Sequence, residues 1–122
     1  MTVQPLTLLR PATSEEKAVV NWLLVYAATR PEAKDLLSQV AELQVVGVCG
    51  CGCPSIDFEV GDQSANAGIV ADAIGRDAQG NQVGALLWWQ DGHVSGLEVY
   101  SLGGGDQWYL PRLESLQPWP SA

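Results

Sequence analysis

The chain has 122 residues, of which 47% are hydrophobic and 16% are charged, a size and balance typical of one globular domain spanning residues 1–122. Fourteen acidic residues against six Lys and Arg give a net charge of −8. Phosphate backbones repel such a chain, so we expect no nucleic-acid partner. A basic protein would be attracted to it, although a general role of the charge in solubility is the simpler explanation.

The N-terminal residues 1–12 lack the charged, apolar and small-residue regions that make up a signal peptide. The longest apolar run, residues 18–28, contains Asn21 and has about half the roughly 20 residues that a membrane span needs. An odd number of cysteines, three, argues against a secreted disulfide framework. We therefore expect a cytoplasmic protein with no membrane partner.

Two helices are predicted near the start of the chain. Thr13 and Glu16 have the spacing of a capping box, so a helix should begin there and continue to about Ala28. Apolar residues occupy most of its circumference, which predicts a largely buried helix. Pro31 ends it and suits the first turn of a second helix, which should reach about Glu42 with one apolar face.

From Leu43 onward the apolar residues alternate with a period of two, which predicts strands. The expected strands are residues 43–49, 55–60, 69–75, 82–90 and 94–101. Asp91-Gly92 is the strongest hairpin signal, because a type I′ turn needs positive φ at both positions. Short turns between successive strands predict an antiparallel meander. The fold class is therefore α+β, with two N-terminal helices packed on one face of a four- or five-stranded sheet.

Two adjacent tryptophans, Trp88 and Trp89, lie in the most apolar strand. Neighbouring strand residues face opposite sides of a sheet, so only one of the two can contact the helices. We expect the apolar C-terminal tail, from Trp108 to Trp119, to cover the other one, since monomers seldom expose large apolar patches. Alternatively, that tryptophan belongs to a surface for a protein partner or for a second copy of the chain.

All three cysteines lie in the stretch VCGCGCPSI, residues 48–56. In an extended strand Cys49, Cys51 and Cys53 would point to one side, the side that also carries the carboxylates of Asp57 and Glu59. The glycines between the cysteines and the proline after them weaken a strand, so a bend is the better prediction.

A bend of this kind can bring the thiolates of Cys49, Cys51 and Cys53 onto one metal ion, for which zinc is the candidate. Structural zinc prefers four ligands and usually C-x₂-C spacing, so His93 would have to complete the site. A redox role is a weaker alternative, because no nearby Lys, Arg or helix N-terminus would lower a thiol pKa. We favour cysteines that only fill small spaces in a tight bend, with no cofactor.

The sequence does not predict an enzyme. The only histidine lies at a hairpin turn, where no nucleophile is expected beside it. Asp57, Glu59 and Glu98 alternate along strands on faces where charge is normally solvated. No phosphate-binding loop, dinucleotide-binding motif or metalloprotease motif occurs.

Residues 51–55, CGCPS, and residues 91–101, DGHVSGLEVYS, carry a resemblance. The second segment resembles a D-G-x-(L/V)-S-x-L-E-x-Y strand signature of small uncharacterised bacterial proteins, some of which look like immunity proteins of toxin systems. The resemblance implies an acidic bacterial α+β domain that binds a protein and catalyses nothing, and it transfers no site residues. The residues that we predict to bind a partner are Trp88, Trp89, Asp57, Glu59 and Glu98.

Overall fold

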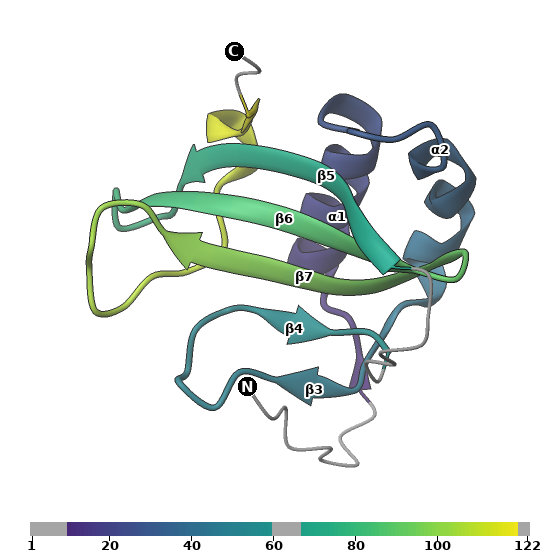
Figure 1. Ribbon diagram of the computed structural model, residues 1–122. Helices are drawn as coiled ribbons and strands as arrows, with labels where there is room; N and C mark the ends of the chain where they lie inside the picture. Colours follow the sequence, from purple (N-terminus) through teal and green to yellow (C-terminus); the bar gives the residue numbers. More distant parts are fainter. Residues whose placement is uncertain (1–9, 60–66, 120–122) are drawn as a thin grey trace.

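The computed structural model describes residues 10–59 and 67–119 and has an α+β fold with helices on one face of an antiparallel sheet (Figure 1). The helices are α1 (Ser14–Tyr26), α2 (Ala33–Leu36) and two 3₁₀ segments, η1 (Leu37–Glu42) and η2 (Leu113–Ser115). Six strands form the main sheet in the order β3 (Gly47–Val48), β4 (Ile56–Asp57), β7 (His93–Ser101), β6 (Gln82–Gln90), β5 (Ala67–Arg76) and β8 (Gln117–Pro118). Two short strands, β1 (Arg10–Pro11) and β2 (Gln44–Val45), form a separate pair.

The predicted capping box begins α1. The Glu16 backbone N–H donates to Thr13 Oγ1 at 3.1 Å, and the Thr13 backbone N–H donates to Glu16 Oε1 at 2.8 Å. Arg10 also donates to both carboxylate oxygens of Glu16, at 2.9 and 3.0 Å, which ties β1 to the helix. Burial alone would raise the pKa of Glu16, but the hydrogen bonds from Arg10 and Thr13 outweigh it and lower that pKa.

The second predicted helix differs from a regular α-helix over residues 31–42. One α-helical turn, α2, is followed by the more tightly wound η1. Within η1 the Gln39 side chain donates to the Gly92 carbonyl at 2.8 Å and accepts from the Val94 backbone N–H at 3.0 Å. This segment is therefore fastened to the turn between β6 and β7.

The turn at Asp91-Gly92 forms as predicted. Asp91 has a φ of 46° and Gly92 a φ of 82°, and Gln90 pairs with His93 to close the hairpin. Strands β5, β6 and β7 then follow one another as antiparallel neighbours.

The rest of the sheet is not the predicted meander. The segment predicted as one strand over 43–49 is divided between β2, which pairs with β1, and β3, which pairs with β4. The segment predicted as a strand over 55–60 forms only the two-residue β4, which pairs with β7 instead of β5, and its residue 60 lies outside the described residues. The sheet has six strands because β8 adds to the outer edge of β5.

The alternation along β6 decides which tryptophan meets the helices. Trp89 lies on the helix side, is 7% exposed, and has the Arg30 guanidinium 5.0 Å from its ring centroid. Trp88 lies on the opposite side, which we call the outer face, and is 36% exposed. By the register of β5, β6 and β7, the side chains on the outer face include Asp72, Ile74, Leu86, Trp88, Glu98 and Tyr100.

The C-terminal tail does not bury Trp88, contrary to our expectation, although Trp108 lines a cavity together with Trp88. Leu116 is buried in the core, and the Trp119 backbone N–H donates to the Asp72 carbonyl at 3.0 Å, beside the pairing of β8 with β5. At the edge of a sheet, backbone N–H and C=O groups lack partners unless another segment pairs with them. The pairing of β8 with β5 supplies such partners and fixes the tail along the edge. No helix within residues 10–59 and 67–119 is long and apolar enough to cross a membrane.

Candidate functional site

The three cysteines lie in the loop of residues 49–55 that joins β3 to β4, here called the cysteine loop. Its backbone is closed by two hydrogen bonds, from Gly52 N–H to the Cys49 carbonyl at 3.2 Å and from Cys49 N–H to the Ser55 carbonyl at 3.3 Å. Gly52 has a φ of +87°, a conformation that residues with a side chain rarely adopt. The glycines therefore build the predicted bend.

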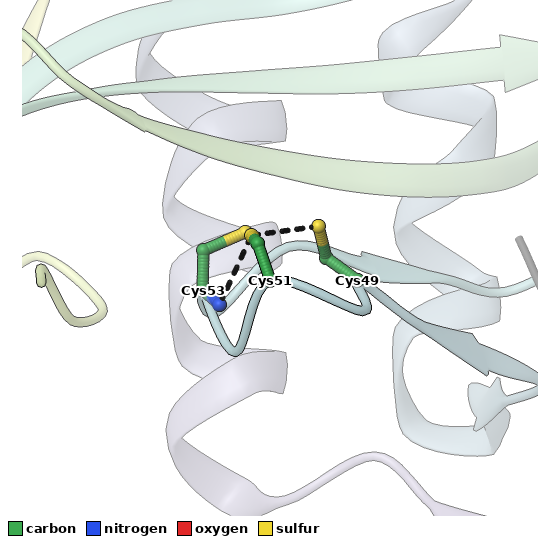
Figure 2. A group of neighbouring side chains, drawn as sticks. All are labelled: Cys49, Cys51 and Cys53. Atoms are coloured by element: carbon green, nitrogen blue, oxygen red, sulfur yellow. Dashed lines mark hydrogen bonds between the residues drawn. The ribbon is translucent and has the colours of Figure 1, made fainter. Parts of the chain in front are cut away.

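The bend brings the three sulfurs together, as Figure 2 shows. All three Sγ atoms lie within 4.8 Å of one another. Cys49 Sγ and Cys51 Sγ are 2.9 Å apart, and the Cys53 backbone N–H donates to Cys51 Sγ at 3.4 Å. A disulfide has an S–S bond of about 2.05 Å, so no disulfide joins these three cysteines.

The contacts between the thiols make them unequal. The hydrogen bond from Cys49 lowers the pKa of Cys51, as do hydrogen bonds from the side chain and backbone N–H of Cys53. The same contact with Cys51 raises the pKa of Cys49 to about 11. Cys51, which is exposed, therefore loses its proton before Cys49, and the group that lowers its pKa most is a neighbouring thiol rather than a base or a helix N-terminus.

We expect substoichiometric iodoacetamide at pH 8 to alkylate Cys51 before Cys49, as measured by peptide mass spectrometry. A pKa of about 11, against 9.0 for an ordinary thiol, leaves Cys49 with about a hundredfold smaller thiolate fraction. Cys49→Ala should slow the alkylation of Cys51 by removing the hydrogen-bond donor. Labelling of Cys49 at the same rate as Cys51 would contradict this assignment.

The cysteine loop, β4, β6, β7 and Trp108 of the tail line an open cavity of about 400 Å³. Two side chains fix its walls to the backbone of Val99. Ser55 Oγ donates to the Val99 carbonyl at 3.1 Å and accepts from the Val99 N–H at 2.8 Å. Trp108 Nε1 donates to the same carbonyl at 2.8 Å. Cys49, Cys53, Asp57, Trp88, Glu98 and Tyr100 are among the other lining residues.

Two carboxylates contribute to this cavity. Asp57 lies opposite Gly96 in the β4–β7 pair, and burial raises its pKa. Glu98 Oε1 accepts a hydrogen bond from Trp88 Nε1 at 3.2 Å. Tyr100 lies beside them, and its pKa is raised by burial and also by the negative charges of Asp72 and Glu98. The cavity is therefore both acidic and aromatic.

The structure brings five of the predicted site residues to this cavity: Cys49, Cys53, Asp57, Trp88 and Glu98. Cys49 and Cys53 reach the cavity beside Asp57 from the bend and not from an extended strand. Cys51 lies in the same loop, within the sulfur cluster.

Three predicted residues lie elsewhere. Trp89 is on the helix side of the sheet, and His93 Nδ1 pairs with Glu59 Oε1 at 3.3 Å. His93 begins β7, whereas the cysteine loop is fastened to Val99 six residues later, about 20 Å along an extended strand. This structure therefore does not place His93 as the fourth ligand of a Cys₃His site.

The sequence did not identify Trp108 or Tyr100 as part of the site. For Tyr100 the sequence does hold a signal, which is the glycine Gly84 inside an apolar strand. In the structure Tyr100 pairs with Gly84, and its ring occupies the space that a Cβ on Gly84 would fill. Trp108 approaches β7 through a loop of eleven residues, 102–112, between β7 and η2, and no local pattern predicts that contact.

Comparison of the chain with protein-family models, curated proteins and solved structures gave no match.

Proposed function

We propose that this protein is non-catalytic and binds a soft metal ion, Zn²⁺ or Cu⁺, through Cys49, Cys51 and Cys53. The observation that carries the proposal is the clustering of three Sγ atoms within 4.8 Å of one another. A zinc–sulfur bond is about 2.3 Å long, so two sulfurs on one zinc are less than about 4.6 Å apart. Little movement of the loop is needed to reach that arrangement.

The protonation of the thiols supports the same assignment. Cys51, with its lowered pKa, would supply the first thiolate, and the bound ion would displace the protons of the other two. Thiolates are the protein ligands that soft ions prefer. The loop is also accessible, because Cys51 is exposed and Cys49 and Cys53 are only partly buried.

Among the described residues, no histidine or carboxylate joins the three sulfurs at this distance. The proposed ion would therefore have three protein ligands and one position for water or an external ligand. A three-thiolate site of this kind suits Cu⁺ as well as Zn²⁺, which is why both ions are included.

Native mass spectrometry under reducing conditions tests the proposal. With one equivalent of Zn²⁺ or Cu⁺ we expect one ion per chain, with release of protons measured by a pH indicator in weak buffer. The control is the triple variant C49S/C51S/C53S, which should stay metal-free at the same concentrations. Equal loading of the triple variant, or a metal-free chain, would contradict the proposal.

A second candidate function is a protein-binding module of the immunity-protein kind, which a second copy of the chain or a different protein would occupy. It is favoured by the outer face, where Trp88 is 36% exposed beside acidic side chains on a chain of net charge −8. Exposed aromatic residues are effective anchors at interfaces, and complementary charge speeds association.

A further inference from the structure

We propose that the cavity beside the cysteine loop binds the guanidinium group of an arginine side chain on a basic partner polypeptide. This inference rests on the second candidate function, for which it names the chemistry of recognition. Cys49 and Cys53, two of the proposed metal ligands, also line the cavity, so the inference is tested on the metal-free chain.

Within residues 10–59 and 67–119, the carboxylates of the cavity have no cationic partner. The ion pairs of the described residues engage Glu16, Glu32, Glu59 and Glu114, and none engages Asp57 or Glu98. No Lys, Arg or His is found among the described residues that line the cavity. Burial of the unpaired Asp57 carboxylate raises its pKa, and a bound cation would relieve that cost.

The aromatic residues of the cavity favour the same ligand. Trp88, Tyr100 and Trp108 line it. Both indole N–H groups already have acceptors in the protein, Glu98 Oε1 for Trp88 and the Val99 carbonyl for Trp108. The indole rings therefore offer a ligand their π-systems, which attract cations. Arg30 above the ring of Trp89, at 5.0 Å, is an example of this contact on the other side of the sheet.

Guanidinium satisfies both requirements at once, because it is planar, stacks on aromatic rings and forms paired hydrogen bonds with a carboxylate. The cavity volume of about 400 Å³ falls within the range of about 300–1,000 Å³ for sites of small ligands. The net charge of −8 would attract the basic polypeptide that carries the arginine.

The test is a ¹⁵N NMR titration of the full chain with N-acetyl-arginine methylamide. We expect saturable shifts of the Trp88 and Trp108 indole N–H signals and an unchanged Trp89 signal. N-acetyl-citrulline methylamide, which is neutral and nearly the same shape, should bind about tenfold more weakly. Asp57→Asn and Glu98→Gln should each weaken arginine binding, whereas Glu42→Gln, an exposed change outside the cavity, should not.

Equal binding of the citrulline compound would overturn the choice of a cation, while the outer face would remain a binding surface. Absence of shifts with either compound would overturn the inference. A titration with the peptide Ac-Gly-Arg-Gly-NH₂ then distinguishes failure of this inference from failure of the second candidate function. Shifts on other parts of the outer face would keep a protein-binding surface and place arginine recognition outside the cavity, which also overturns the inference.

Discussion

Replacing Asp77 with alanine is expected to lower the free energy of unfolding by about 3 kcal/mol. The side chain of Asp77 is 2% exposed and accepts four hydrogen bonds of 2.9 Å. Their donors are the backbone N–H groups of Gln79, Asn81 and Tyr109 and the side-chain amide of Asn81. Each buried donor left without an acceptor costs about 1–3 kcal/mol, and access of water to the turn reduces the total.

The effect of Asp77 depends on pH in a defined direction. Burial would raise its pKa, but the four hydrogen bonds outweigh burial and lower it below 3.8. Its contribution to stability is therefore complete above about pH 4 and is lost as the pH falls through the lowered folded-state pKa. In Asp77→Ala, the part of the decrease in the free energy of unfolding at low pH that comes from Asp77 should be missing.

Urea denaturation of the wild-type chain and Asp77→Ala at pH 7 and pH 3 measures both effects. Asp35→Ala is the matched control, because Asp35 is exposed on α2 and should change stability by less than about 0.5 kcal/mol. Because Tyr109 follows Trp108, the variant should also loosen that wall of the cavity. A loss no larger than that of Asp35→Ala would show that the four hydrogen bonds contribute little.

Some local signals in the sequence predicted local structure correctly, although the helix predicted over residues 31–42 is only partly α-helical. The pair Thr13 and Glu16 predicted the start of α1, and Asp91-Gly92 predicted a turn with positive φ at both residues. Each signal acts within four residues, so the helix start and the turn can form without contacts to distant segments of the chain. The same is true of the alternation that separates Trp88 from Trp89.

Contacts between distant segments could not be predicted in this way. The pairing of β4 with β7 joins Ile56 to Leu97, and β8 joins the tail to β5. A period of two shows that a segment is extended and which face is apolar, but not which neighbour it will have. The meander was therefore wrong where the sheet order departs from the chain order.

The candidate site also has features that local sequence predicts and features that depend on contacts between distant segments. The bend predicted from the glycines and Pro54 brings the three sulfurs together, and Cys49 and Cys53 line the cavity with Asp57. Which end of β7 the cysteine loop would reach depended on the pairing of β4 with β7. That pairing places Ser55 at Val99 and leaves His93 near Glu59 instead.

Replacing any one of the three cysteines with serine should weaken metal binding by at least about 100-fold. Changes to residues that only orient a metal ligand already cost about 10- to 100-fold, and each of these changes removes a ligand itself. Competition with a chromophoric chelator measures the affinity of Cys49→Ser, Cys51→Ser and Cys53→Ser against the wild-type chain. The loop is accessible, so the metal-free variants should unfold at the same urea concentration as the metal-free wild type.

The pH dependence of the affinity distinguishes ligation from incidental binding. A pKa of about 11 keeps Cys49 protonated at neutral pH, so a metal that binds it must displace that proton. Each displaced proton makes the affinity fall about tenfold for every unit by which the pH is lowered. At a metal concentration of 100 times Kd, the bound ion should add about 2.7 kcal/mol to the free energy of unfolding, and a chelator should remove it. If one serine variant kept wild-type affinity and pH dependence, that cysteine would not be a ligand, and the three-thiolate site would be wrong.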